Sequence, residues 1–302
     1  MLEKIDFSNI PNYENISDSF RGLYYDPSGE YSITYTYGMV GVIYNSTVVD
    51  EEDIGKWDLM WNEKYAGRIL QFNNSRDAFG TAMYKLGIDV NTTDISEWRR
   101  ALEELKLQQP HVQGYVMDEI YNKMESGEAS VSSYYAGDYL SMTDNNEDLG
   151  FYYPVNDDGE IVTNLFVDAY CIPKGAANKE LAEIYINYML SEEPAIANAE
   201  YIYYASPNSA VYESEVYIED MGEESMEVLY PEGFDFKEKY NSLSYHNLDS
   251  ETLALVNNLW EELKISSATG DGVYVLAVAI VIGLVAYWIY HTVRKKRRER
   301  YY

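Results

Sequence analysis

Cysteine and basic residues are both scarce in this sequence. With Cys171 as its only cysteine, the chain can form no internal disulfide. Lysine and arginine number 22 against 51 aspartates and glutamates, which gives a formal net charge of -29. Such a surface repels the phosphates of nucleic acids and of anionic lipids, so the composition argues against a nucleic-acid partner.

Patterns that would indicate catalysis are also missing. The three histidines, His111, His246 and His291, lie far apart and show no metal-ligand spacing. The sequence has no nucleophile elbow and no phosphate-binding loop. Cys171 stands in the apolar stretch FVDAYCIPKG, which predicts a buried strand and a small core residue rather than a nucleophile. We therefore expect no enzyme, no metal site and no cofactor.

One long apolar run lies near the C-terminus. Residues 273–293 contain no acidic residue, lysine or arginine, and about 18–21 apolar residues span a hydrocarbon core of roughly 30 Å. The tail at 294–302 is strongly basic, and basic flanks of a membrane span stay in the cytoplasm. The pattern predicts a single-pass cell-membrane protein with its N-terminal domain outside and its C-terminus in the cytoplasm. A buried core helix is the alternative interpretation.

The N-terminus lacks the apolar segment that an exported chain needs. MLEKIDFSNIPNYENISD carries charges at Glu3, Lys4 and Asp6 and contains no apolar run of about 7–15 residues. Either the predicted orientation is wrong, or the front of the protein is absent from this sequence.

Segments with strand patterns alternate with segments of helical pattern. YSITYTYGMVGVIYN at 31–45 is rich in β-branched and aromatic residues and predicts extended chain. NNSRDAFGTAMYKLGI predicts a helix that begins after Asn74 or Ser75 and ends at Gly87. Such alternation predicts an α/β protein with parallel-type sheets, and roughly 270 residues before the apolar run suit two lobes.

Further segments extend this alternation. Strand patterns occur at 128–135 and 164–173, and helical patterns at 94–110, 178–202 and 250–264. In the segment 178–202, apolar residues recur at the spacing of one helix face. They are Leu181, Ile184, Tyr185, Tyr188 and Met189.

The order and wording of these segments resemble the spermidine/putrescine-binding proteins of ABC importers. Matching stretches include LEKIDFSNIPN, WDLMWNEKYAGRILQFNNSRDAFGTAMYKLG, GEASVSSYYAGD, FVDAYCIPKGAANKELAEIYINYML and LWEELK, and the matches cover nearly all of residues 1–265 in family order. The resemblance implies a two-lobed, hinged solute-binding fold that closes on a ligand in the cleft between its lobes. It implies a polyamine such as putrescine or spermidine as ligand, and ABC permease subunits with their ATPase as partners.

The resemblance also implies a division of the chain. Its parts are residues 1–40 as the remaining first part of lobe 1, 41–165 as lobe 2, 166–215 as the return segment of lobe 1, 216–265 as a C-terminal helical segment, 266–272 as a linker, 273–293 as the membrane helix and 294–302 as the basic tail. In the family, L-x-K-I-D follows the first strands and helices of lobe 1. The chain therefore resembles a member that lacks roughly a hundred residues at its front, including the export signal. A truncated, split or fused gene would each explain this.

A polyamine site needs carboxylates for its ammonium groups and aromatic faces for its methylenes. The positions that the resemblance assigns to ligand binding are Asp168, Asp77, Tyr135, Phe166, Asn74 and His246.

These six positions depart from the family in several ways. Asn74 replaces an acid, and Asp77 is one methylene shorter than the usual glutamate. Tyr135 and Phe166 stand where the family has tryptophan, while Asp168 is retained. Helix capping is the alternative role for Asn74 and Asp77, a core position for Tyr135, and an internal salt bridge for Asp168.

Two further functions remain open beside a polyamine receptor. One is a membrane-anchored binding protein for another small organic solute. The other is a ligand-sensing ectodomain, although a tail of about ten residues after the span favours anchoring over signalling.

Overall fold

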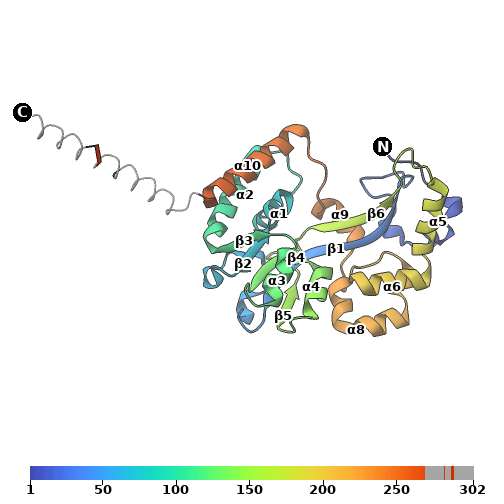
Figure 1. Ribbon diagram of the computed structural model, residues 1–302, viewed down its shortest axis with the longest axis horizontal. Helices are drawn as coiled ribbons and strands as arrows, with labels where there is room; N and C mark the ends of the chain where they lie inside the picture. The colour runs from blue at the N-terminus through green and yellow to red at the C-terminus, as the bar shows by residue number, and fades with distance from the viewer. Residues whose placement is uncertain (269–281, 283–286, 289–302) are drawn as a thin grey trace, which may run out of the picture.

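The computed structural model describes residues 1–268 together with 282, 287 and 288 (Figure 1). Among these residues the strands are β1 (Ser32–Asn45), β2 (Ile69–Phe72), β3 (Val112–Val116), β4 (Val131–Tyr135), β5 (Leu149–Tyr152) and β6 (Leu165–Cys171). The α-helices are α1 (Ser75–Leu86), α2 (Ile95–Gln108), α3 (Glu119–Glu125), α4 (Ala136–Thr143), α5 (Lys179–Met189), α6 (Glu192–Ile202), α7 (Ser209–Tyr212), α8 (Glu215–Leu229), α9 (Phe236–Leu243) and α10 (Ser250–Ala268).

The long strand β1 joins two lobes. Its first half, from Ser32 to Met39, pairs with β6 in lobe 1, and its second half, from Val40 to Asn45, pairs with β4 and β5 in lobe 2. Figure 1 shows β1 and β6 running side by side from one lobe into the other. The predicted two-lobed α/β fold is therefore confirmed, and the lobes share a continuous strand.

Lobe 2 contains a sheet in the order β3-β2-β4-β1-β5. β2 is parallel to β3 and β4, but β1 is antiparallel to β4, β5 and β6. The expectation of parallel-type sheets is therefore wrong for β1, because this strand pairs with β4, which runs the opposite way. Helices α1, α2 and α10 pack against one another in this lobe. Its core contains fully buried side chains such as Leu70, Phe79 and Leu102.

The start and end of α1 follow local chemistry. Asn74 adopts an extended backbone, and its side chain accepts hydrogen bonds from the backbone N–H groups of Arg76 and Asp77. Gly87 ends the helix with a φ of 64°, in the left-handed region that favours glycine. Asp94 caps α2 in the same way by accepting from the Ser96 N–H. These caps confirm the predicted starts of both helices.

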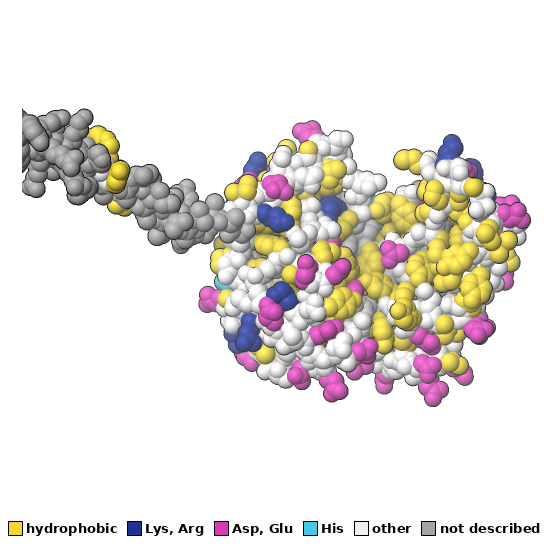
Figure 2. Space-filling view, viewed as in Figure 1, with side chains coloured by type: hydrophobic (Ala, Val, Ile, Leu, Met, Phe, Trp, Pro, Cys, Tyr) yellow, Lys and Arg dark blue, Asp and Glu magenta, His cyan; other side chains and the backbone are white. Residues whose placement is uncertain are grey.

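Lobe 1 has a smaller core around β6 and the first half of β1. Ile10, Ile16, Ile33 and Leu165 are buried there. Helix α5 packs on the short 3₁₀ helices η1 (Phe7–Asn9) and η2 (Pro11–Asn15). The opposite face of α5 is open. Figure 2 shows hydrophobic side chains gathered on the surface of this lobe.

Two predictions about lobe 1 are wrong. One concerns the helix expected at 178–202, which is split into α5 and α6. The apolar residues that recur at helical spacing are largely exposed on α5: Leu181 by 63%, Ile184 by 51%, Tyr185 by 56% and Tyr188 by 58%. Cys171 is also exposed rather than buried. Among the described residues β6 pairs with β1 alone, and Leu165 is the one residue of this strand that is buried.

Within the described part of the chain, no helix is both long and apolar enough to cross a membrane. The predicted span at 273–293 lies outside the described residues, apart from positions 282, 287 and 288.

Candidate functional site

Tyr135 and Phe166 meet where β1 passes between the lobes. Tyr135, the last residue of β4, lies opposite Val40, and Phe166 on β6 lies opposite Gly38. Their rings are 5.2 Å apart and roughly perpendicular. Gly38 is required for this contact, because a Cβ atom there would lie 2.6 Å from the Phe166 ring. The structure therefore brings two predicted site residues together.

Asp77 lies in the first turn of α1, beside Tyr135. Its side chain is only 6% exposed. Burial raises the pKa of this carboxyl to about 6, with the Arg76 guanidinium and the Tyr135 hydroxyl acting in the opposite direction. Among the described residues Asp77 forms no ion pair, although the Arg76 guanidinium acts on it from nearby, so this buried acid faces an aromatic wall with its charge only partly offset. A cationic ligand would remove that cost.

Tyr135 is the common neighbour of three carboxylates. Burial is the largest cause of its raised pKa, and the charges of Asp77, Asp138 and Asp168 add to it. Tyr135 therefore lies within reach of three acidic charges at the lobe crossing.

Asp168 lies in this region but in a different environment from the one predicted. We expected a buried charge in an apolar strand, and instead the side chain is exposed. Its carboxylate accepts a hydrogen bond from the Thr36 hydroxyl at 2.9 Å. The expectation was wrong because β6 is not buried along its length: Leu165 is buried, whereas Asp168 and Cys171 are exposed.

Asn74 and His246 both have other partners in the structure. The Asn74 side-chain oxygen is occupied by capping α1, with the Arg76 N–H at 2.9 Å. His246 stacks on Tyr24 of lobe 1 at 3.9 Å, and its backbone N–H donates to the Asn91 side chain. Burial raises the pKa of the adjacent Tyr245 hydroxyl, and the nearby Asp77 charge adds to that rise.

Asp138 and Tyr204 were missed from the sequence. Tyr204 follows α6, and its ring lies 5.9 Å from that of Phe166. Its hydroxyl donates to the Asp138 carboxylate at 2.5 Å. An acid three residues after a predicted ligand-binding aromatic, in the stretch YYAGD, was the available signal for Asp138.

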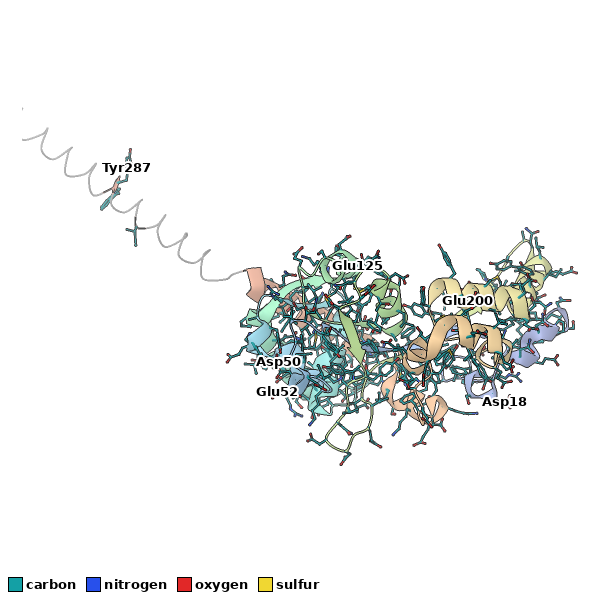
Figure 3. All side chains as sticks on the ribbon, turned by 90° about the horizontal axis from the view of Figure 1, so that it is seen from below. Asp18, Asp50, Glu52, Glu125, Glu200 and Tyr287 are labelled. Carbon is teal, nitrogen blue, oxygen red and sulfur yellow. The ribbon has the colours of Figure 1, made fainter. Side chains whose placement is uncertain are left out.

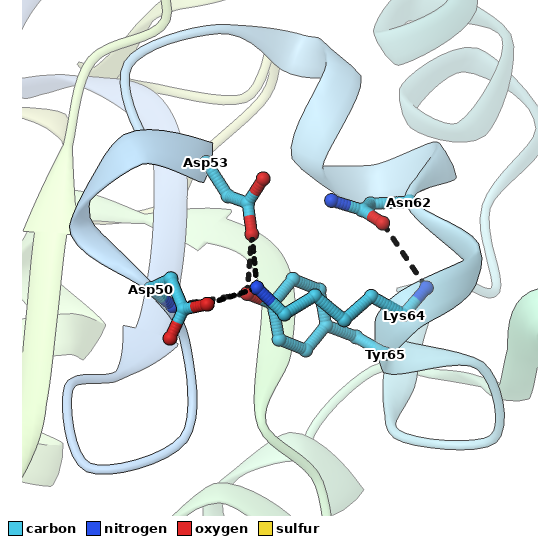
Figure 4. Close-up of polar contacts among 5 residues, drawn as sticks. All are labelled: Asp50, Asp53, Asn62, Lys64 and Tyr65. Carbon is cyan, nitrogen blue, oxygen red and sulfur yellow. Dashed lines mark hydrogen bonds and ion pairs between the residues drawn. The ribbon is translucent and has the colours of Figure 1, made fainter.

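Asp50 and Asp53, in contrast to Asp77, have a lysine as ion-pair partner. Lys64 forms ion pairs with Asp50 and with Asp53, the latter at 3.0 Å, and the Tyr65 hydroxyl donates to Asp53 at 2.6 Å (Figure 4). The Tyr65 bond, followed by that of Lys64, lowers the pKa of Asp53. These acids join the 3₁₀ helices η4 (Glu51–Asp53) and η6 (Glu63–Tyr65), which is a structural role.

Many other acids lie on the outer surfaces of both lobes. Figure 3 labels Asp50, Glu52 and Glu125 on lobe 2, and Asp18 and Glu200 on lobe 1. Charges spread in this way serve solubility and identify no ligand. Asp77 and Asp138 differ because they combine partial or full burial with aromatic neighbours.

Two lobes joined by a shared strand, with acids and aromatic rings at the crossing, define a hinged solute-binding protein. The model of the bacterial extracellular solute-binding protein family matches residues 1–222, and the chain belongs to this family.

Individual relatives point in the same direction. The spermidine/putrescine-binding periplasmic protein of Salmonella typhimurium is 32% identical over 210 residues, which are 70% of this chain and 59% of that protein. The putrescine/cadaverine-binding protein of Pseudomonas aeruginosa is 24% identical over a match that covers 87% of this chain and 75% of that protein. A crystal structure of the spermidine/putrescine ABC transporter substrate-binding protein of Streptococcus pneumoniae superposes with a TM-score of 0.75 at 28% identity, covering 88% of this chain and 79% of that one. The chain thus spans about 59% of the length of the Salmonella relative.

Proposed function

We propose that this chain is the extracellular substrate-binding component of an ABC importer and binds a polyamine at the lobe crossing. The observation that carries the proposal is Asp77, a buried carboxylate without an ion pair among the described residues, beside the aromatic pair Tyr135 and Phe166. An ammonium group would pair with the carboxylate, and the methylenes would lie against the rings. Relatives named as spermidine/putrescine-binding proteins support the same ligand class.

The proposed contacts take different parts. Asp77 binds an ammonium group, Tyr135 and Phe166 form the apolar wall, and Asp168 offers a second carboxylate from lobe 1. Asn74 contributes through the start of α1 and His246 through the loop before α10. The ligand thereby contacts both lobes, so binding favours the closed arrangement, in which the permease subunits with their ATPase would receive it.

Isothermal titration of the full chain in mild detergent with putrescine, spermidine and spermine tests this function. We expect binding of at least one of the three, and a loss of about 30-fold or more in affinity for Asp77→Asn, since a buried charge pair loses one partner. Asp53→Asn is the matched control, because Asp53 already has Lys64 as its partner. Absence of heat with all three amines, together with binding of a sugar or an anion, would mean that the site serves another solute.

We infer further that residues 273–293 anchor the chain in the cell membrane, with residues 1–272 outside and the basic tail 294–302 in the cytoplasm. The apolar run and the basic tail of the sequence support this topology. The chain should stay in the membrane fraction after alkaline carbonate extraction, whereas a version that ends at residue 268 should be released. Release of both versions would contradict the anchor.

We also infer that a polypeptide segment outside the described residues completes lobe 1. Support comes from the open face of α5 and from β6, which pairs with β1 alone among the described strands. Contiguous apolar side chains on a protein surface are normally covered by another segment or a partner. The change in the free energy of unfolding caused by Leu181→Ala measures whether this face is open in the isolated chain.

A further inference from the structure

Arg76, in the first turn of α1, is a half-buried cation without an acidic ion-pair partner. Among the described residues, Arg21 and Arg100 form ion pairs, but Arg76 forms none. Its Nη1 atom is buried and has no hydrogen-bond partner in the described part of the chain. An arginine side chain stays charged even when it is buried, and a buried charge is costly unless it is paired.

Neutral groups hold the Arg76 guanidinium in place. Its central carbon lies 4.7 Å from the centre of the Tyr245 ring and 5.5 Å from a Trp98 ring, both within the range of cation–π contacts. Its Nη2 atom donates to the Asn91 side-chain oxygen at 3.2 Å. Rings and an amide orient a guanidinium, but they do not cancel its net charge as a carboxylate would. The charge of Arg76 therefore remains available to act on its surroundings.

The position of Tyr245 depends on a close approach to α1. A Cβ atom at Gly80 would lie 1.9 Å from the Tyr245 hydroxyl oxygen, so glycine is required at this position. The Tyr24 hydroxyl donates to the Tyr245 carbonyl oxygen at 2.7 Å. These contacts fix the Tyr245 ring along α1, and the ring in turn fixes the guanidinium of Arg76.

Asp77 is the acid next to this charge. Arg76 and Asp77 are consecutive residues of α1, and consecutive side chains of a helix do not face each other. The Asp77 carboxylate therefore remains open to a ligand ammonium group. Burial raises the pKa of Asp77 to about 6, and the charge of Arg76 is the larger of the two influences that oppose this rise.

The other titratable groups that interact with Asp77 are phenols. Among the described residues they are Tyr84 on α1, Tyr134 and Tyr135 on β4, and Tyr245 before α10. Burial raises the pKa of each phenol above its ordinary value, so all four stay neutral near pH 7.

Three more charged groups lie in this part of the molecule. Asp138 on α4 and Asp168 on β6 act on Tyr135. Lys264 on α10 donates to the Asn73 side chain. Arg76 is the charged group that acts on Asp77 itself.

We propose that Arg76 acts through Asp77: its uncompensated charge keeps this carboxylate ionised at neutral pH and so sets the lower pH limit of ligand binding. This rests on the proposed function and deepens it, because it assigns the pH response of the site to a residue that contacts no ligand. The same charge repels the ligand's ammonium group at every pH. Arg76 therefore favours binding at low pH, where Asp77 would otherwise be protonated, more than at high pH.

Titration of the full chain with putrescine between about pH 5.5 and about pH 8.5 tests the proposal. Putrescine keeps its ammonium groups in this range, because alkylammonium groups titrate near pH 10. Arg76→Met keeps an unbranched side chain and removes the charge. An opposite charge nearby lowers the pKa of a carboxyl by about one unit or more. We therefore expect the ratio of wild-type to Arg76→Met affinity to fall by about fivefold or more from the low to the high pH.

Two further variants separate charge from structure, because a purely structural loss would lower the affinity by the same factor at every pH. Arg76→Lys keeps a positive charge, so its affinity ratio to wild type should not change with pH. Asn91→Ala removes the hydrogen bond to Nη2 and keeps the charge, and its ratio should also stay constant. Thermal unfolding of each variant shows whether it folds.

Urea unfolding without ligand gives a second readout. A folded-state pKa above the ordinary value makes stability fall as pH rises toward that pKa. In the wild-type chain this fall ends near pH 6, the pKa of Asp77. In Arg76→Met it should continue to about pH 7, so the variant should lose stability relative to wild type between about pH 6 and about pH 7.

The outcomes separate this proposal from the proposed function. A putrescine affinity ratio of Arg76→Met that stays constant with pH overturns the role of Arg76 and leaves polyamine binding intact. A ratio that changes with pH in Arg76→Lys or Asn91→Ala overturns it as well, since packing and not charge would then matter. Parallel ligand-free curves for wild type and Arg76→Met refute the action of Arg76 on Asp77 alone. A wild-type chain that binds no diamine or triamine refutes both proposals.

Discussion

Lobe 2 and lobe 1 share the strand β1 but differ in how far neighbouring strands and helices bury their apolar side chains. In lobe 2 the strand β2 lies between β3 and β4, and its four residues are all buried. In lobe 1 the strand β6 pairs with β1 alone among the described residues, and α5 turns apolar side chains to solvent. The same kind of apolar sequence is therefore core in one lobe and surface in the other, because burial depends on the layers that cover it.

The largest expected effect contrasts two leucines, one in each lobe. Leu70 on β2 is fully buried, whereas Leu181 on α5 is 63% exposed. Leu70→Ala should lower the free energy of unfolding by about 2–5 kcal/mol, because it removes buried methyl groups and leaves a cavity. Leu181→Ala should change it by less than about 0.5 kcal/mol, as expected at an exposed position. Urea unfolding of the two variants beside the wild-type chain measures both.

A cost of about 2 kcal/mol or more for Leu181→Ala would show that the α5 face is already covered in the isolated chain. The contrast between the lobes, and the inference that a further segment completes lobe 1, would then both fail.

The second expected effect concerns Asp77, which is buried in lobe 2 at the lobe crossing. The pKa of Asp77 is about 6 in the folded chain, against an ordinary value of 3.8. The folded state therefore holds the proton more tightly, so Asp77 makes stability fall as pH rises from about 4 to about 6. The total is about 3 kcal/mol at most.

Asp77→Asn should remove this dependence and stabilise the ligand-free chain at pH 7 while weakening polyamine binding. The free energy of unfolding, measured from pH 4 to 7 for wild type and variant, gives the difference curve. Asp168→Asn is the control, because that side chain is exposed and should produce no such difference. Parallel curves for wild type and Asp77→Asn would show that the pKa of Asp77 does not differ between the folded and the unfolded state.

Much of the local structure was predictable because it depends on near neighbours. The α1 helix begins after Asn74 and ends at Gly87, as capping chemistry requires. The strand expected at 31–45 is β1. Tyr135 and Phe166, two positions that the family resemblance implies, lie in contact. Burial was predicted wrongly for Asp168 and Cys171, which were expected inside an apolar strand and are exposed.

By itself, the sequence determined the helix and strand starts, the acidic surface, the lack of a disulfide and a family resemblance that the comparisons confirm. Only the tertiary structure decided which apolar faces are covered and which acids lack a cation. Periodicity shows that a helix has an apolar face but not whether another layer lies against it. The contact between Tyr204 and Asp138 joins residues that are 66 positions apart in the chain, and no local pattern encodes it.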